Sequence, residues 1–280
     1  MTQQTWLITG VNSGLGRSMT EQLLARGDRI AGTVRKLETM DDLKARYGDR
    51  LWLAKLDVTD MLAIPQVVNK AFADLGKIDV IVNNAGYGLF GAAEALSDEQ
   101  IYHQINTNLV GPIQVVRAAM PHLRGQGGGR LIAISTYGGQ ATHPGASLYH
   151  ASKWGMEGFF DSLYGEAAFF NIGVTIVEPG SARTGFREAA GAQAAEFEAY
   201  KGTPIGSIRA RLGDRAHLPS GDPSKMAAAI IESANQSPAP KRLVLGSDAY
   251  GFIQNALTER LAAVEAQKHL AASTDIPAGT

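Results

Sequence analysis

A tyrosine and a lysine stand four residues apart in the segment Tyr149-His150-Ala151-Ser152-Lys153. Residues at this spacing are neighbours on one face of an α-helix, so the phenol and the ammonium would lie side by side. A free tyrosine titrates near pH ~10, and a positive charge close by stabilises the phenolate and lowers its pKa. Lowering it to about 7 takes roughly 4 kcal/mol, which Lys153 and a second positive group together can supply. The pair predicts a proton-transfer site, although the same spacing also occurs on exposed helix faces.

A glycine-rich turn near the start of the chain is suited to holding an anion. Residues 5–9 form a short β-prone segment, and residues 17–26 have the pattern of a helix. The turn between them contains the candidate cofactor-binding residues Gly10, Asn12, Ser13, Gly14, Leu15 and Gly16. Glycines let the backbone approach a ligand closely, and a helix N-terminus offers free N–H groups to a pyrophosphate. We therefore expect a phosphate-binding turn, although its Gly-x-x-x-Gly-x-Gly order differs from the Gly-x-Gly-x-x-Gly pattern of many dinucleotide-binding proteins.

The end of the second predicted strand, residues 28–34, bears on the choice of dinucleotide. In nucleotide-binding folds an acidic residue here binds the hydroxyls of the adenosine ribose, whereas a cation accepts a 2′-phosphate. Val34 stands where an acid would be expected, and Arg35 follows it. We therefore expect NADP rather than NAD as cofactor; the alternative is that Arg35 is an ordinary solvated loop residue.

Predicted strands and helices alternate along the rest of the chain. Further β-prone segments lie at 51–56, 78–82, 131–134, 174–177 and 243–245. This alternation predicts an α/β fold: a single Rossmann-like domain over residues 1–280, with a doubly wound parallel sheet of about seven strands and helices on both faces. In such a sheet the ligand crevice lies at the carboxyl ends of the strands, where the motifs fall.

Residues 181–222 break this alternation. The segment is rich in alanine, glycine and charged residues, and it has a helical pattern only around 193–200. A long irregular insertion beside a crevice often covers the ligand. We therefore predict a substrate-binding lid at 181–222.

Composition limits the possible classes of function. The 280 residues carry a net charge of −1, which gives no reason to expect nucleic acid or an anionic membrane as partner. The chain has no cysteine, and its histidines lack ligand-like spacing, so we expect no metal. It shows no apolar run long enough to span a membrane and no signal peptide, so we expect a cytoplasmic protein.

Five motifs together resemble the short-chain dehydrogenase/reductase superfamily along nearly the whole chain. They are Thr9-Gly10-x-x-x-Gly14-x-Gly16, Asn83-Asn84-Ala85-Gly86, Asn108, Tyr149-x-x-x-Lys153 and Pro179-Gly180, in the family's order and spacing. Each motif is weak alone, but the combination is highly specific. The resemblance implies a Rossmann-type parallel sheet and hydride transfer between a nicotinamide cofactor and an alcohol or carbonyl substrate.

The resemblance also implies catalytic roles. Tyr149 would be the general acid or base, Lys153 would lower its pKa and bind the nicotinamide ribose, and Asn108 would hold a water that links Lys153 to solvent. The oxidised nicotinamide would be the second positive group. Family members usually carry a serine thirteen residues before the tyrosine, and this chain has Thr136 there. Its hydroxyl can play the same part, whereas strand alternation should point Ser135 to the other face.

Further positions match the family's contacts with the cofactor. They are Asp57 and Val58 at the adenine, Asn84, Ala85 and Gly86 near the adenine ribose, and Pro179, Gly180 and Thr184 around the nicotinamide. Together with the glycine-rich turn, Arg35, Tyr149 and Lys153, they make up the expected cofactor site.

The substrate and the assembly are less closely defined. Candidates to line an apolar substrate pocket, or else ordinary core residues, are Tyr87, Phe90, Tyr137 and Phe186. By resemblance we expect a homodimer or homotetramer built partly from predicted helices at 98–123 and 149–170.

Two other functions compete with the redox enzyme. One is a non-redox enzyme of the same fold, and the other is a cofactor-sensing regulator without turnover. A sensor has no need of a proton-transfer pair, so the intact set of Thr136, Tyr149 and Lys153 argues against it.

Overall fold

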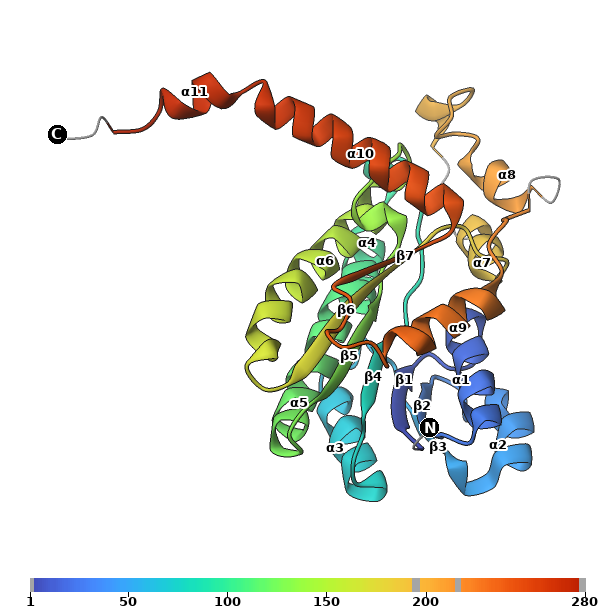
Figure 1. Ribbon diagram of the computed structural model, residues 1–280. Helices are drawn as coiled ribbons and strands as arrows, with labels where there is room; N and C mark the ends of the chain where they lie inside the picture. The colour runs from blue at the N-terminus through green and yellow to red at the C-terminus, as the bar shows by residue number, and fades with distance from the viewer. Residues whose placement is uncertain (1–2, 193–196, 215–217, 277–280) are drawn as a thin grey trace.

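The computed structural model of the chain describes residues 3–192, 197–214 and 218–276 (Figure 1). Its centre is a seven-stranded parallel sheet in the order β3-β2-β1-β4-β5-β6-β7. The strands are β1 (Thr5–Thr9), β2 (Arg29–Val34), β3 (Leu51–Lys55), β4 (Val80–Asn83), β5 (Gly129–Ile134), β6 (Ile172–Pro179) and β7 (Arg242–Leu245). The predicted doubly wound sheet is confirmed. The strand order reverses between β1 and β4, and this is the place where such sheets bind ligands.

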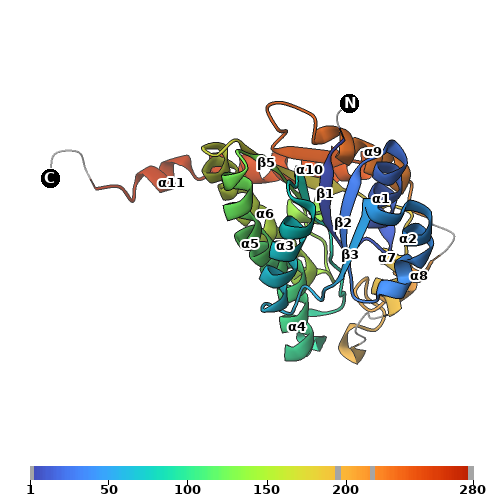
Figure 2. The same ribbon diagram turned by 90° about the horizontal axis from the view of Figure 1, so that it is seen from below.

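Helices cover both faces of the sheet (Figure 2). One face carries α1 (Gly14–Arg26), α2 (Asp41–Tyr47) and α9 (Pro223–Ser233). The other face carries α3 (Ala63–Leu75), α5 (Gly111–Gly125) and α6 (Ser147–Ala168). Successive side chains of a strand point to opposite faces of the sheet, so each strand contributes to both cores. In β1, Trp6 and Ile8 belong to the core under α1, and Leu7 belongs to the core under α5. The apolar strands are therefore buried on both sides, as parallel strands require.

The long helix predicted at 98–123 consists of three consecutive segments. α4 (Asp98–Ile105) is followed by a π-helical turn, Asn106–Val110, and then by α5. Pro112 has no N–H with which to bond the carbonyl four residues earlier, that of Asn108, so the regular helix is interrupted there. The interruption lies at Asn108, which is completely buried.

The segment 181–222 leaves the sheet after β6 and returns before α9. Its base is closed by a bridge between Ala182 and Gly221. It contains two short helices that the sequence pattern does not predict, α7 (Phe186–Ala192) and α8 (Ile208–Gly213). Of the helix predicted around 193–200, residues 193–196 lie outside the described residues, and Glu198–Tyr200 form a 3₁₀ turn.

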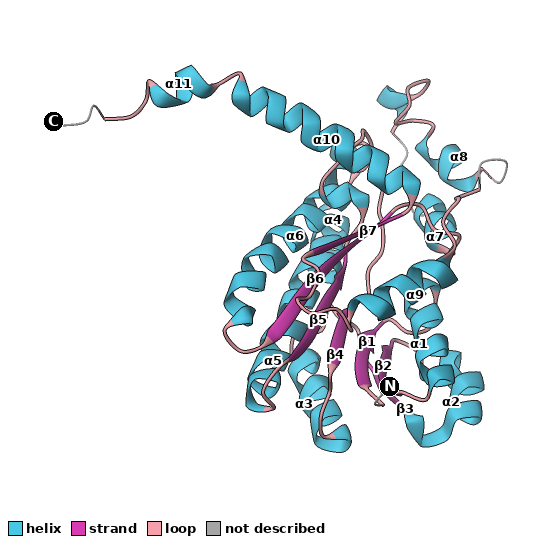
Figure 3. Ribbon diagram, viewed as in Figure 1, coloured by secondary structure: helices cyan, strands magenta, loops and turns pink. Residues whose placement is uncertain are grey.

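Two helices, α10 (Ser247–Glu265) and α11 (Lys268–Ala272), follow β7. They extend away from the sheet (Figure 3), and every residue from 257 to 276 is exposed. Among the described residues, no helix is both long and apolar enough to cross a membrane.

Candidate active site

Tyr149 lies in the first turn of α6, next to the carboxyl end of β5. It is only 8% exposed, and its hydroxyl makes a hydrogen bond with Thr136, which follows β5. The ring centres of Phe90 and Phe186 lie 5.4 and 5.8 Å from that of Tyr149. The phenol is therefore enclosed by the loop after β4, the turn after β5 and the start of α7.

Lys153 lies one helical turn after Tyr149 and is also buried. Its ammonium donates a 2.8 Å hydrogen bond to the carbonyl oxygen of Ile134, the last residue of β5. An added Cβ atom on Gly86 would lie 3.7 Å from this ammonium. Burial lowers the pKa of Lys153 to about 8, against the opposing effect of the nearby Glu157 charge. Lys153 thus connects α6 with the end of β5 and lies beside the loop that follows β4.

The expected lowering of the Tyr149 pKa by Lys153 stays a prediction, because burial has the largest effect on that pKa in the chain itself. Burial raises the pKa of Tyr149, and the hydrogen bond with Thr136 offsets only part of the rise. Desolvation disfavours the charged form of both side chains, phenolate and ammonium alike, and residue spacing does not reveal it. A phenolate at this site therefore requires positive charge in addition to that of Lys153.

The two hydroxyl residues after β5 point in different directions, as alternation predicts. Thr136 bonds with Tyr149, and its hydroxyl lies 3.4 Å from the carbonyl oxygen of Pro179, which accepts its hydrogen bond. Ser135 instead donates a 2.7 Å hydrogen bond to Glu157 on α6. Of the two, only Thr136 is placed beside the phenol.

Asn108 anchors the loop after β4 to α6. Its amide nitrogen donates to the carbonyl oxygen of Tyr87 at 2.8 Å and to the Ser152 hydroxyl at 3.1 Å. Its amide oxygen accepts a 3.1 Å hydrogen bond from the Tyr87 backbone N–H. The side chain is thus occupied by protein groups, and the water-holding role implied by the resemblance stays a prediction.

The glycine-rich turn joins β1 to α1, and its glycines are required by geometry. Gly10 and Gly14 have φ values of 72° and 54°, which favour glycine. A Cβ atom on Gly16 would lie 2.2 Å from the carbonyl oxygen of Gly10. Asn84 donates hydrogen bonds of 2.8 and 3.0 Å to the carbonyls of Thr9 and Gly10, so the loop after β4 holds the turn in place.

The N-terminus of α1 fits a phosphate group. Ser13 is its N-cap residue but makes no side-chain capping bond, and the first turn contains no acidic residue. Asn12 and Ser13 are exposed, whereas Leu15 packs against the core under α1. Uncapped N–H groups at the positive end of a helix attract anions, so these residues fit the pyrophosphate of a dinucleotide.

Two other groups of predicted cofactor residues lie at the same edge of the sheet. Thr184 is next to the glycine-rich turn: its side chain lies 3.7 Å from the position that a Cβ atom on Gly14 would occupy. Ala85 lies against the same turn, 3.1 Å from where a Cβ atom on Gly10 would be. Gly180 leaves room for Asp248, whose carboxylate would be 2.0 Å from an added Cβ atom. The structure therefore brings together residues that lie up to about 170 positions apart in the chain.

The residues predicted at the adenosine end follow β2 and β3. Val58 is buried, and Asp57 accepts hydrogen bonds from the backbone and hydroxyl of Thr59 at 2.9 and 2.7 Å. Burial raises the pKa of Asp57, but the Thr59 bonds and the charge of Arg35 outweigh it and hold that pKa below its usual value. Exposed Arg35 therefore lies within electrostatic range of Asp57.

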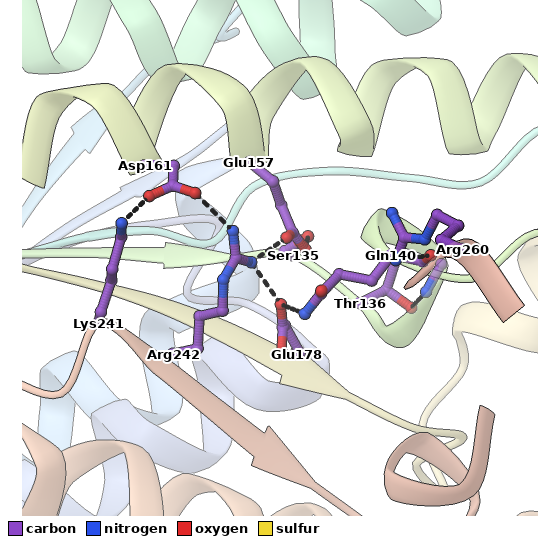
Figure 4. A network of polar contacts seen from close by, with 10 residues as sticks. Ser135, Thr136, Gln140, Glu157, Asp161, Glu178, Lys241, Arg242 and Arg260 are labelled. Atoms are coloured by element: carbon purple, nitrogen blue, oxygen red, sulfur yellow. Dashed lines mark hydrogen bonds and ion pairs between the residues drawn. The ribbon is translucent and has the colours of Figure 1, made fainter. Parts of the chain in front are cut away.

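The sequence motifs do not predict the charged residues that lie behind the site. Buried Glu157 and Glu178 form a cluster with the partly exposed Arg242 between α6 and the strands β5, β6 and β7 (Figure 4). Two signals were available: Glu178 follows a mostly apolar strand segment, and Glu157 stands four residues after Lys153.

The histidines near Tyr149 are not arranged as metal ligands. His150 is buried, and burial lowers its pKa to about 4, with a smaller contribution from His143. In the part of the chain that the structure describes, no three His, Cys, Asp or Glu side chains are grouped to hold a metal ion.

Comparisons with known proteins agree with this geometry. A family model described as short chain dehydrogenase matches residues 4–195. The oxidoreductase BOA17 of Botryotinia fuckeliana is 34% identical, over 88% of this chain and 90% of its own length. A solved short-chain dehydrogenase from Streptomyces avermitilis has a TM-score of 0.88 at 36% identity, covering 98% of this chain and 99% of its own. The chain belongs to the short-chain dehydrogenase family.

A further solved neighbour was studied with cofactor. It is the closed form of a serine dehydrogenase complexed with NADP+, with a TM-score of 0.74 at 25% identity, covering 86% of this chain and 94% of its own.

Proposed function

We propose that the protein is an oxidoreductase that transfers a hydride between NADP(H) and an alcohol or carbonyl substrate. One observation carries the proposal: Thr136, Tyr149 and Lys153 meet at the sheet edge that also bears the glycine-rich turn. A bound nicotinamide supplies or accepts the hydride, and its oxidised ring adds positive charge. That charge is what the phenolate of Tyr149 lacks in this site.

Tyr149, Thr136 and Lys153 each have a separate role in proton transfer to or from the substrate. Tyr149 donates its hydroxyl proton to the carbonyl oxygen during reduction and accepts the proton from the alcohol during oxidation. Thr136, already bonded to Tyr149, offers its hydroxyl to the substrate oxygen. Lys153 holds its charge one helical turn from the phenol. All three are buried, and exclusion of water strengthens each electrostatic contact.

Arg35 supports NADP as the cofactor. It is exposed at the end of β2, where Val34 replaces an acid, and it lies near Asp57. A guanidinium there binds a 2′-phosphate by charge-assisted hydrogen bonds, which the ribose of NAD does not offer. The serine dehydrogenase complexed with NADP+ supports the same choice.

Fluorescence titration with NADPH and NADH tests this assignment. Arg35→Ala should weaken NADPH binding at least about tenfold, the loss of more than about 1.4 kcal/mol of charge-assisted contact, and leave NADH binding nearly unchanged. Arg46→Ala, which removes an exposed arginine of α2, is the control and should change neither affinity. Equal binding of both cofactors, or no effect of Arg35→Ala, would make Arg35 a solvated loop residue.

We also propose that residues 181–222 form a lid over an apolar substrate. A buried apolar cluster joins Tyr149 and Phe90 to Ala190 of α7 and Ile208 of α8. A substrate with apolar groups beside its carbonyl would take over these contacts when it reaches Tyr149. A panel of ketones in which charged compounds react faster than apolar ones of the same size would contradict this assignment.

A further inference from the structure

In the cluster behind the active site, two buried carboxylates share one guanidinium. Glu157 is 3% exposed and Glu178 is completely buried. Nη1 of Arg242 donates hydrogen bonds to Oε2 of Glu157 and, at 2.7 Å, to Oε1 of Glu178. Figure 4 shows the three side chains meeting between α6 and the strands.

The same cluster holds both ends of the turn that follows β5. At the start of the turn, Ser135 donates a 2.7 Å hydrogen bond to Oε1 of Glu157. At its end, Gln140 donates a 2.5 Å hydrogen bond to Oε1 of Glu178. Because both carboxylates bond to Arg242, the two ends of the turn are fixed to one guanidinium.

The turn fixed in this way is part of the active site. The turn contains Thr136. It also packs directly on the carboxylate of Glu157, whose Oε1 lies 2.0 Å from the position that a Cβ atom on Gly139 would occupy. On its other side, an added Cβ atom on Gly138 would be 2.8 Å from the ring of His150. A shift of the cluster would therefore move the hydroxyl that bonds with the phenol.

Glu157 also acts on the active site through its charge. It stands one helical turn after Lys153, and its carboxylate raises the pKa of that lysine against the lowering by burial. Burial and the charge of Glu178 raise the pKa of Glu157, and Ser135 and Arg242 oppose this. The groups around Glu157 are Ser135 after β5, Glu178 on β6, Arg242 on β7, and Lys153 and Asp161 on α6, with Lys241 paired to Asp161.

We propose that Glu157, held by Arg242, is a positioning residue of the active site: its charge supports the ammonium of Lys153, and its hydrogen bond fixes the turn that carries Thr136. The inference rests on the proposed function of these two residues. Stability does not explain the cluster, because buried ion pairs are generally no more stabilising than apolar side chains of the same size.

Titration of Lys153 by ¹⁵N NMR of the lysine side chains tests the electrostatic part. Glu157→Gln keeps the shape and can still bond to Ser135 and Arg242, but it removes the charge. The titration midpoint of Lys153 should fall by about one pH unit. Asp161→Asn is the matched control, since it changes a carboxylate on the same helix that also contacts Arg242 but no part of the turn, and it should leave the midpoint unchanged. An unchanged midpoint in Glu157→Gln would overturn this part of the proposal.

Amide hydrogen exchange of residues 135–140 tests the mechanical part. Arg242→Lys keeps the charge but loses the planar guanidinium, whose Nη1 bonds Glu157 and Glu178 while Nη2 bonds Asp161, so exchange in the turn should become at least about tenfold faster than in β1. Asp161→Asn should not change it. Equal exchange in Arg242→Lys and wild type would overturn the positioning role. Neither the NMR titration nor the hydrogen-exchange measurement requires turnover. Either can therefore contradict the positioning role of Glu157 while the proposed hydride transfer remains valid. Conversely, a wild type without activity would contradict the proposed function but would not change the titration or the exchange rates.

Discussion

At the scale of single residues, Lys153 illustrates a conflict between stability and chemistry. Its charge is buried at the bottom of the site, and burial lowers its pKa from 10.5 to about 8. Such a shift corresponds to about 3 kcal/mol by which the charged lysine destabilises the folded state near neutral pH. A role in proton transfer and ribose binding gives a reason to retain the charge there.

Lys153→Met should therefore make the protein more stable at pH 7. We expect the free energy of unfolding to increase by about 2 kcal/mol, because the lost hydrogen bond to Ile134 offsets about 1 kcal/mol of the gain. Between about pH 8 and pH 10.5 the unfolded chain binds the proton more tightly than the folded one, so wild-type stability rises with pH and the difference shrinks.

Urea unfolding at pH 7 and pH 10 measures this effect. Lys70→Met, at an exposed lysine of α3, provides the control and should change stability by less than about 0.5 kcal/mol at either pH. The same gain for Lys153→Met at both pH values would mean that the buried charge is not its cause.

Residue spacing predicts the direction of side chains along a strand but not the burial of Tyr149. Strand alternation correctly separates Thr136 from Ser135, because it depends only on the period of the strand. The burial that raises the pKa of Tyr149 is not predicted, because Phe90 and Phe186, which contribute to it, lie 59 and 37 residues away in the sequence. No local pattern reports such contacts.

At the scale of elements, the glycine-rich turn packs too closely against Asn84 to leave room for a side chain at Gly16. Gly16→Ala would place a methyl group 2.2 Å from the Gly10 carbonyl and 2.4 Å from the Asn84 amide. We expect a loss of about 3 kcal/mol in unfolding free energy, typical of overpacking, and at least about tenfold weaker NADPH binding.

Thermal unfolding and NADPH titration of Gly16→Ala check this prediction. Gly125→Ala, at the end of α5, is its control, since nothing lies within 4 Å of an added Cβ atom there. It should leave both properties nearly unchanged. Wild-type stability and affinity in Gly16→Ala would show that the turn is less rigid than its packing indicates.

Elements with a clear period were predictable, and short ones were not. All seven strands and the helices packed on them follow from apolar periodicity and from glycine stops, with bounds shifted by a few residues. The helix predicted at 98–123 is interrupted ahead of Pro112 by a π-helical turn. α7 and α8 have only seven and six residues and lie in an irregular segment, so no period identifies them.

At the scale of the whole molecule, the exposed side of α6 is the surface that we propose for a homodimer or homotetramer. Ala151, Gly158 and Ser162 are exposed there and small, which permits close approach of a second helix. Gly158→Arg should convert the assembly to a monomer of 29.7 kDa in light scattering. Folding should be unaffected, because nothing lies within 4 Å of an added Cβ atom.

Gly251→Arg on α10 is the matched control, since it also has free space around it. It should leave the assembly intact. A monomeric wild type at working concentration would refute the proposed assembly, and an intact oligomer in Gly158→Arg would place the interface elsewhere.

The most direct measurement of the proposed function follows the hydride itself. The protein is incubated with NADPH deuterated at the nicotinamide C4 and a panel of apolar ketones and aldehydes, and the alcohols are analysed by mass spectrometry. We predict deuterium on the carbinol carbon. Tyr149→Phe should lower the rate about 10³-fold, because it removes the general acid, and bind NADPH nearly as well as wild type. Alcohol without deuterium, or unchanged turnover in Tyr149→Phe, would contradict hydride transfer assisted by Tyr149.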